Sequence, residues 1–157
     1  MPPEASFVRE VMTTSVVSVE PSTALVDAAL LLRGNSIRHL LVMEGEELVG
    51  LLTDRDIQRC APSRLIPISE EDYNAIFAET TVNRVMTRNP QTVSSTTPLA
   101  TAIATMQQGR FGCLPVVDEG LVVGILTRSD LVEAFRRLLT GKSLVREEQG
   151  IDPQSTI

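Results

Sequence analysis

Two polar patterns of the same kind occur in the chain, Thr53-x-x-Asp56 and Thr127-x-x-Asp130, each directly after an apolar run. A carboxylate in this position can accept hydrogen bonds from two neighbouring hydroxyl groups, as the ribose of a nucleotide presents them. The same pattern is typical of a helix start, where Thr caps the helix and the acidic residue completes a capping box. Either pair alone is compatible with a ligand site and with a purely structural cap.

Each pair belongs to a longer repeat with a constant offset of 74 residues. Val11-Met12-Thr13 returns as Val85-Met86-Thr87, and Gly50, three residues ahead of Thr53, returns as Gly124. Two copies of one supersecondary unit favour two halves that bury their faces against each other, because neither half has enough core alone. The repeated Thr–Asp pair therefore predicts two pseudo-symmetric pockets.

Composition narrows the functional classes. The 157 residues are sufficient for one compact domain, and the net charge of −6 argues against non-specific nucleic-acid binding, which needs clustered Lys and Arg. No apolar run is long enough to span a membrane, and no secretory signal is present at the start, so we expect a cytoplasmic protein without a membrane partner.

The residues of enzyme and metal sites are not arranged in any known pattern. Cys60 and Cys113 have no metal-binding or redox spacing, and they are expected to be reduced, small hydrophobic residues. His39, the one histidine, forms no Cys–His motif with either. There is no Walker loop, GxGxxG or HExxH sequence. We therefore predict that the protein is not an enzyme and has neither catalytic nor metal-binding residues.

The elements that must position the Thr–Asp pairs follow from the apolar patterns. We expect the order βαββα twice, in a mixed α/β (α+β) fold. The predicted strands are 16–19, 39–43, 48–52, a segment near 92–93, 113–117 and 121–126. The predicted helices are a turn at 7–12, one capped by Ser22 or Thr23 and ending at Gly34, one from Thr53 to Pro62, one capped by Ser69, one over 97–108, and one from Thr127 to Gly141.

These elements divide the chain into four parts. The first repeat is expected over 8–62, a helical linker over 63–80, the second repeat over 81–140, and a flexible tail over 141–157.

The combined frame resembles a known family. Val-Met-Thr, a strand, a helix after Thr, Leu-x-Val, and Gly-x-Leu-Thr-x-x-Asp are similar to a CBS domain, present here as a tandem pair (a Bateman module) over about residues 8–139. The linker, with Ala61-Pro62-Ser63 and Ser69-Glu70-Glu71, resembles that of stand-alone CBS-pair proteins of the acetoin-utilisation type.

The resemblance implies two repeats packed with pseudo-twofold symmetry and two clefts between them. Such clefts bind adenosine-containing ligands (AMP, ADP, ATP or S-adenosylmethionine) as regulatory ligands and not as obligatory cofactors. Carried over by position, Asp56 and Asp130 would hold the ribose hydroxyls, with Thr53 and Thr127 close to the ribose or phosphate.

The resemblance also implies where the rest of the ligand would lie. The base would lie against Val16-Val17-Ser18 and Pro90-Gln91-Thr92. The residues expected to face phosphate are Arg38, His39, Arg128 and Arg110. His39 has the alternative of being a half-buried residue at a strand start. We expect Arg38, His39 and Arg128 to make the Asp130 cleft the tighter one, because the matching approach to Asp56 holds Gly112 and Cys113.

The resulting prediction is a non-catalytic regulatory module, with energy sensing as its role, that transmits its ligand state to an unidentified protein partner. We also expect a homodimer through the last helix, with Leu131, Phe135, Leu138 and Leu139, and the helix at 54–61. The alternative is a structural dimerisation or scaffold module whose clefts are empty in the cell. A transcriptional regulator is disfavoured by the acidic charge.

Overall fold

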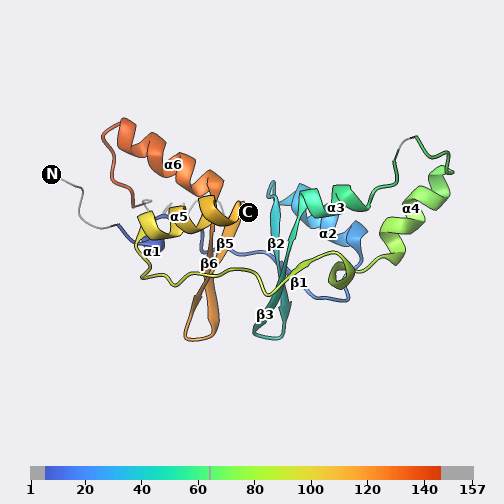
Figure 1. Ribbon diagram of the computed structural model, residues 1–157, viewed down its shortest axis with the longest axis horizontal. Helices are drawn as coiled ribbons and strands as arrows, with labels where there is room; N and C mark the ends of the chain where they lie inside the picture. The colour runs from blue at the N-terminus through green and yellow to red at the C-terminus, as the bar shows by residue number, and fades with distance from the viewer. Residues whose placement is uncertain (1–5, 64, 146–157) are drawn as a thin grey trace, which may run out of the picture.

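Two β-hairpins stand side by side at the centre of the molecule, and helices cover their outer sides (Figure 1). In this computed structural model the described residues are 6–63 and 65–145, so the predicted tail beyond residue 145 lies outside them. The hairpins are β2 (His39–Glu44) with β3 (Glu47–Thr53), and β5 (Cys113–Asp118) with β6 (Leu121–Thr127). One outer side carries α2 (Leu25–Gly34), α3 (Asp54–Cys60) and α4 (Glu70–Glu79), and the other carries α1 (Val8–Val11), α5 (Leu99–Gly109) and α6 (Arg128–Leu139).

The mixed α/β fold is confirmed, but the first strand of each repeat is shorter than predicted. The sheet of the first repeat has the order β1-β2-β3-β4, in which β1 (Ser18–Val19) runs parallel to β2 and β4 (Thr87–Arg88) runs antiparallel to β3. In the second repeat the strand expected near 92–93 is a single bridge from Val93 to Val116. The predicted βαββα order is therefore complete only in the first repeat.

The segments that begin the two repeats are exchanged between them. The Val82 N–H, in the 3-10 helix η1 (Val82–Arg84), donates to the Thr23 carbonyl at 2.8 Å. The Val8 N–H donates to the Thr97 carbonyl at 3.0 Å, which is the same bond with the repeats reversed. Val82 accordingly lies in the core of the first repeat and Val8 in the core of the second. The sequence repeat and the packing unit therefore do not coincide.

This exchange explains where the first long helix of each repeat begins. We predicted a cap at Ser22 or Thr23, but α2 begins at Leu25, and its N-cap residue Ala24 makes no side-chain bond. The Leu25 N–H instead donates to the Thr80 carbonyl at 2.9 Å. A backbone carbonyl from the exchanged segment thus satisfies a helix-terminal N–H that a capping side chain would otherwise bind.

The hairpins meet through apolar side chains. Leu41 of β2 packs with Cys113 of β5 and Ile125 of β6 in a small core of buried residues. Around it lie four half-buried side chains, Met43, Leu48, Leu51 and Val122. The hydrophobic effect therefore holds the two repeats together as well as each repeat's own core.

The linker also forms the predicted capped helix. The Asp72 N–H donates to Ser69 Oγ at the start of α4, at 3.0 Å. Phe77 packs against the core of the first repeat, while Tyr73 is exposed and its ring contacts Phe77. Among the described helices, none is long and apolar enough to cross a membrane.

Candidate functional site

Both Thr–Asp pairs form complete capping boxes. The Asp56 N–H donates to Thr53 Oγ1 at 3.1 Å, and the Thr53 N–H donates to Asp56 Oδ2 at 2.9 Å. The bonds of Thr127 and Asp130 are equivalent, at 3.2 Å and 2.8 Å. The structural interpretation of the pattern is thus correct for both pairs. A capping box uses only one carboxylate oxygen, so the other oxygen decides whether a ligand can be held.

That second oxygen differs between the repeats. Asp130 is 3% exposed, and its Oδ1 accepts a hydrogen bond from Thr13 Oγ1 at 2.7 Å. Asp56 is half-buried, and within residues 6–63 and 65–145 its Oδ1 accepts no hydrogen bond. Thr87, which occupies the position of Thr13 in the other repeat, has an exposed side chain. The two carboxylates therefore share a position in the repeat but not a hydrogen-bonding state.

Sequence analysis did not identify Thr13 as a site residue. The signal was present, because Thr13 and Thr87 end the repeated Val-Met-Thr segments. The antiparallel bridge from Thr13 to Ile125 brings Thr13 to the end of β6, since Ile125 lies two residues before Thr127 in that strand. Only the exchange of the segments places Thr13 next to Asp130.

His39 lies at the boundary between the repeats. A Cβ atom added to Gly112 would lie 2.9 Å from His39 Nε2, so the imidazole rests against the backbone of the second repeat. The Arg128 N–H donates to the Gly112 carbonyl at 3.2 Å, and the Asp54 N–H donates to the Arg38 carbonyl at 3.1 Å. These bonds bring the starts of α3 and α6 to the same end of the hairpins as His39.

The charges around His39 identify which candidates are close to it. Burial lowers the pKa of His39; the Asp54 and Asp56 carboxylates act to raise it, and the Arg38 and Arg128 guanidinium groups act to lower it. Arg38 and Arg128 are both exposed. The charged groups that influence the pKa of His39 thus come from both repeats, Arg38, Asp54 and Asp56 from the first and Arg128 from the second. We expected these residues to border Asp130; the start of β2 pairs with the end of β3, so His39 also lies beside the start of α3.

The remaining predicted residues are more dispersed. The Val17 carbonyl accepts a hydrogen bond from the Leu41 N–H at 3.2 Å, and Ser18 is exposed in β1. Gln91 is exposed and Thr92 is half-buried. Arg110 is exposed at the end of α5 with φ of 54°. No hydrogen bond or ion pair among the described residues joins Arg110 to the other candidates.

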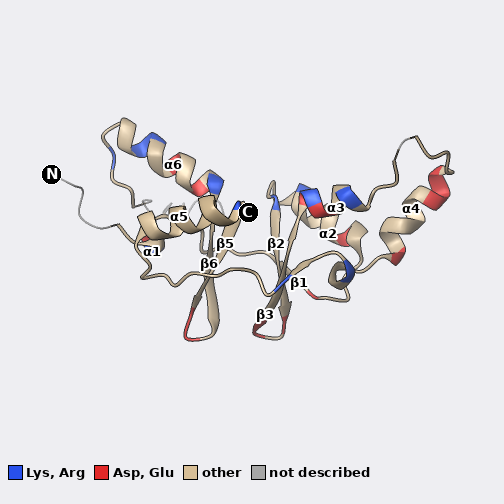
Figure 2. Cartoon of the chain, in the orientation of Figure 1, with Lys and Arg blue, Asp and Glu red and all other residues tan. Residues whose placement is uncertain are grey.

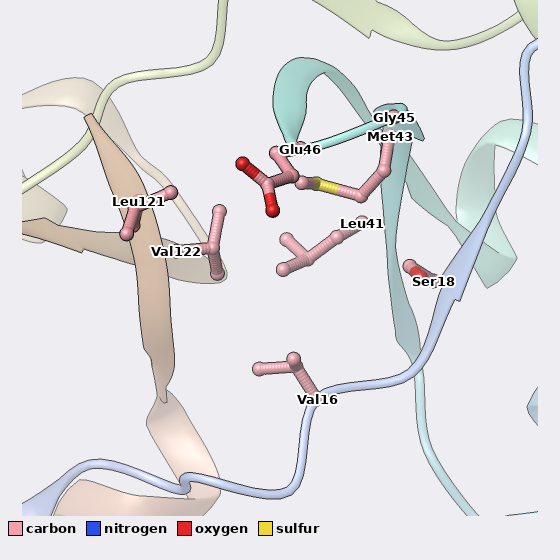
Figure 3. A pocket seen from close by; sticks show the side chains of 8 residues that line it. All are labelled: Val16, Ser18, Leu41, Met43, Gly45, Glu46, Leu121 and Val122. Atoms are coloured by element: carbon pink, nitrogen blue, oxygen red, sulfur yellow. The ribbon is translucent and has the colours of Figure 1, made fainter.

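A pocket of about 360 Å³ lies between the repeats at the other end of the hairpins (Figure 3). Leu41 and Val122 point toward each other from the two hairpins, and the Glu46 carboxylate points toward the same space. The lining residues are Val16, Ser18, Leu41, Met43, Gly45, Glu46, Leu121 and Val122. Its volume is in the range of small-molecule sites. Of the predicted site residues it includes Ser18, whereas the residues from the hairpins were not identified from the sequence.

Charge is distributed unevenly along the hairpins (Figure 2). Acidic residues gather at both hairpin turns, where Glu46 and Glu119 lie. Arg38 directly precedes β2 and Arg128 directly follows β6, so the basic residues lie at the opposite end. Guanidinium groups for a phosphate are therefore available at the end with Arg38 and Arg128, where the Asp54, Asp56 and Asp130 carboxylates also lie, and the Glu46 carboxylate disfavours phosphate in the pocket.

Neither cysteine is arranged for metal binding. Burial raises the pKa of the Cys113 thiol to about 12, and the Asp130 carboxylate contributes in the same direction. In the part of the chain that the structure describes, no group of three or more His, Cys, Asp or Glu residues could hold a metal ion. The described site is thus made of hydrogen-bonding carboxylates, hydroxyls and guanidinium groups.

Comparison with known proteins adds independent findings. The family model described as CBS domain matches residues 8–62 and 82–137. A CBS domain-containing protein of Dictyostelium discoideum is 32% identical over 135 residues, which cover 85% of this chain and 93% of the relative.

Solved structures agree with the family model. The acetoin utilization protein AcuB of Vibrio cholerae has a TM-score of 0.72 and 27% identity, over 87% of this chain and 94% of that one. CBSX2, in complex with AMP, has a TM-score of 0.69 and 29% identity, over 85% and 98%. The CBS domain pair of protein MJ0100, in complex with 5′-methylthioadenosine and S-adenosyl-L-methionine, has a TM-score of 0.70 and 25% identity, over 84% and 97%.

Proposed function

Because this chain belongs to the CBS domain family, we propose that it is a regulatory module that binds an adenosine-containing ligand between its two repeats. The observation that carries the proposal is that the candidate residues lie at the boundary between repeats. His39 of the first repeat rests against Gly112 of the second, and Arg128 of the second repeat acts on His39. The complexes of CBSX2 with AMP and of MJ0100 with S-adenosyl-L-methionine support the ligand class.

In this proposal the ligand is held by three kinds of group. A ribose donates its hydroxyls to a carboxylate of a Thr-x-x-Asp pair, with Thr53 or Thr127 beside it. The base lies against the backbone of Val17-Ser18 or of Gln91-Thr92. Phosphate oxygens accept hydrogen bonds from guanidinium groups, which present fixed donors in a planar fork. The ligand is AMP, ADP, ATP or S-adenosylmethionine.

A thermal-shift series tests the ligand class. AMP, ADP, ATP and S-adenosylmethionine are added in turn, and the melting temperature is recorded against ligand concentration. A ligand that binds only the folded state raises the melting temperature by mass action. At a ligand concentration of a hundred times the Kd, it raises the free energy of unfolding by about 2.7 kcal/mol. Native mass spectrometry of the purified protein then identifies any co-purified ligand. If no adenosine compound shifts the melting temperature, the scaffold alternative replaces this proposal.

Regulation follows from a ligand that touches both repeats. Such a ligand favours one relative placement of the repeats over others, and a protein partner that binds that placement would be affected by the ligand. We propose that the module senses cellular energy state in this way. The partner is a protein that binds one ligand state of the module in preference to the other. No catalytic step is part of the proposal.

We also propose that the module is a homodimer through α6. The helix has an exposed apolar face, with Val132 at 68% and Phe135 at 62% exposure, whereas Leu131 packs on the core of the second repeat. Leu131, one of the residues expected at the interface, therefore faces the core of its own repeat. On α3 no large apolar side chain is exposed, so the apolar part of the proposed interface is on α6 alone.

Light scattering tests the dimer. Phe135→Asp places a charge in the exposed face of α6 and is expected to convert a dimer to a monomer. Leu30→Asp is the matched control, because Leu30 of α2 is similarly exposed at 60% but lies on another helix. A wild-type mass equal to that of one chain at micromolar concentration contradicts the proposal.

A further inference from the structure

The hydrogen bonds of the two carboxylates point to a functional difference between the repeats. Resting on the proposed function, we propose that the phosphorylated ligand binds at Asp56 and is bridged by Arg38 and Arg128, while Thr13 keeps Asp130 closed to ligand. This assignment is the reverse of the one expected from sequence.

The first argument is the state of the carboxylate oxygens. Asp130 Oδ2 accepts from the Thr127 N–H and from Thr127 Oγ1, at 2.8 Å and 3.0 Å, and Oδ1 accepts from Thr13 Oγ1. A ribose at Asp130 must displace the Thr13 hydroxyl from a nearly fully buried group, which exchanges one hydrogen bond for another with little net gain. Asp56 Oδ1 needs no such displacement, since among the described residues it accepts no hydrogen bond.

The second argument is the position of the cations. Arg38 belongs to the first repeat and Arg128 to the second, yet the charges of both lower the pKa of His39. The charge of Asp56 acts on the same pKa and raises it. A ligand with its ribose at Asp56 therefore has a guanidinium group from each repeat within its surroundings. This arrangement favours an anionic nucleotide, because two cations offset the charge of its phosphate groups.

The third argument is the set of backbone contacts that connects the two repeats near these residues. The backbone bond from Asp54 to Arg38 connects the start of α3 with the start of β2, and that from Arg128 to Gly112 does the same for α6 and β5. His39 contacts Gly112 between these two bonds. Phosphate bound by both arginines would thus link the two helix starts, which is how ligand state could alter the placement of the repeats.

Isothermal titration calorimetry with ATP, AMP and adenosine tests the assignment. We expect one ATP per chain, and Asp56→Asn is expected to weaken ATP binding by at least about tenfold, because a charge-assisted acceptor is lost. Asn keeps a side-chain oxygen that can accept the Thr53 N–H hydrogen bond of the capping box, so this variant is expected to fold. Arg38→Gln and Arg128→Gln are expected to weaken ATP more than adenosine, whereas Arg136→Gln, on the outer face of α6 and paired with Glu133, is the guanidinium control.

A separate variant tests the role proposed for Thr13. Thr13→Val removes the hydroxyl that donates to Asp130 while keeping the shape of the side chain, and a second ATP or adenosine per chain is then expected. If ATP binding is lost in Asp130→Asn and retained in Asp56→Asn, the assignment is overturned. If Thr13→Val still binds one ligand, Thr13 does not close the second cleft. If wild-type protein binds none of the three compounds, the proposed function itself fails, which is a separate result.

Discussion

The hydroxyl of Thr13 donates a hydrogen bond to Asp130 Oδ1 at 2.7 Å, across 117 positions of sequence. The bond joins the segment that begins the first repeat to the last helix of the second, α6. Its counterpart in the other repeat would join Thr87 to Asp56, but Thr87 is exposed and the structure records no such bond among the described residues. This side-chain contact, together with the deeper burial of Asp130, thus distinguishes two carboxylates at equivalent positions of the repeat.

This difference predicts unequal effects of two matched substitutions. Thr13→Val is expected to lower the free energy of unfolding by about 1–3 kcal/mol, because a buried carboxylate oxygen loses its donor. Thr87→Val, at the equivalent position, is expected to stay within about 0.5 kcal/mol of wild type, because its side chain is exposed. Urea unfolding followed by circular dichroism measures both free energies of unfolding. Equal losses would show that the Thr13 hydrogen bond does not stabilise the fold.

The exchanged segments predict a glycine requirement at Gly124. A Cβ at this position would lie 2.8 Å from the Thr13 carbonyl oxygen and 2.9 Å from Met12 Sδ. The backbone oxygen cannot move without breaking the bridge to Ile125, so Gly124→Ala is expected to cost about 1–3 kcal/mol of stability, as overpacking does. In Gly34→Ala nothing lies within 4 Å of the new Cβ, and no loss is expected. Thermal unfolding of the two variants provides the comparison, and an unchanged Gly124→Ala would refute the close approach.

The environment of His39 predicts a pH dependence of stability. The folded-state pKa of His39 is lowered from 6.5, chiefly by burial, with Arg38 and Arg128 adding to the effect and Asp54 and Asp56 opposing it. Between the lowered value and 6.5 the unfolded chain binds more protons than the folded chain, so the free energy of unfolding rises with pH through that window. Stability is therefore lost as the pH falls below about 6.5.

His39→Gln tests this dependence directly, because His39 is the one histidine in the chain. Urea unfolding at several pH values between 5 and 8 is expected to give a shallower slope for the variant than for wild type. Parallel curves for the two proteins would mean that burial of His39 does not depress its proton affinity.

The two thiols are expected to react at different rates. The thiolate is the reactive form, and the pKa of Cys113 is raised to about 12, whereas Cys60 is half-buried and its Sγ donates to the Asp56 carbonyl at 3.4 Å. Iodoacetamide at pH 8 is therefore expected to modify Cys60 first, with both thiols modified in urea. Peptide mapping by mass spectrometry gives the order, and faster labelling of Cys113 in the folded protein would contradict the burial argument.

Local patterns determined much of the fold. The hairpin β2–β3 and the capping boxes at Thr53 and Thr127 involve neighbours in sequence, so apolar runs and an i, i+3 pair were sufficient to predict them. The repeat offset predicted two equivalent halves, and equivalent positions do pair alike: the bridge from Thr13 to Ile125 corresponds to the pair of Thr87 and Leu51.

Only the tertiary structure decided which segment completes which repeat. The start of α2 at Leu25 depends on the Thr80 carbonyl, and the second oxygen of Asp130 is bonded by Thr13; both partners come from the exchanged segments. Such contacts join residues far apart in the chain, so local sequence propensities carry no information about them. A backbone carbonyl brought close by the fold can take the place of a capping side chain, and its sequence does not reveal this. The sequence determined the two carboxylate positions, while long-range packing decided that Asp130 is buried with a Thr13 hydrogen bond and that Asp56 is half-buried.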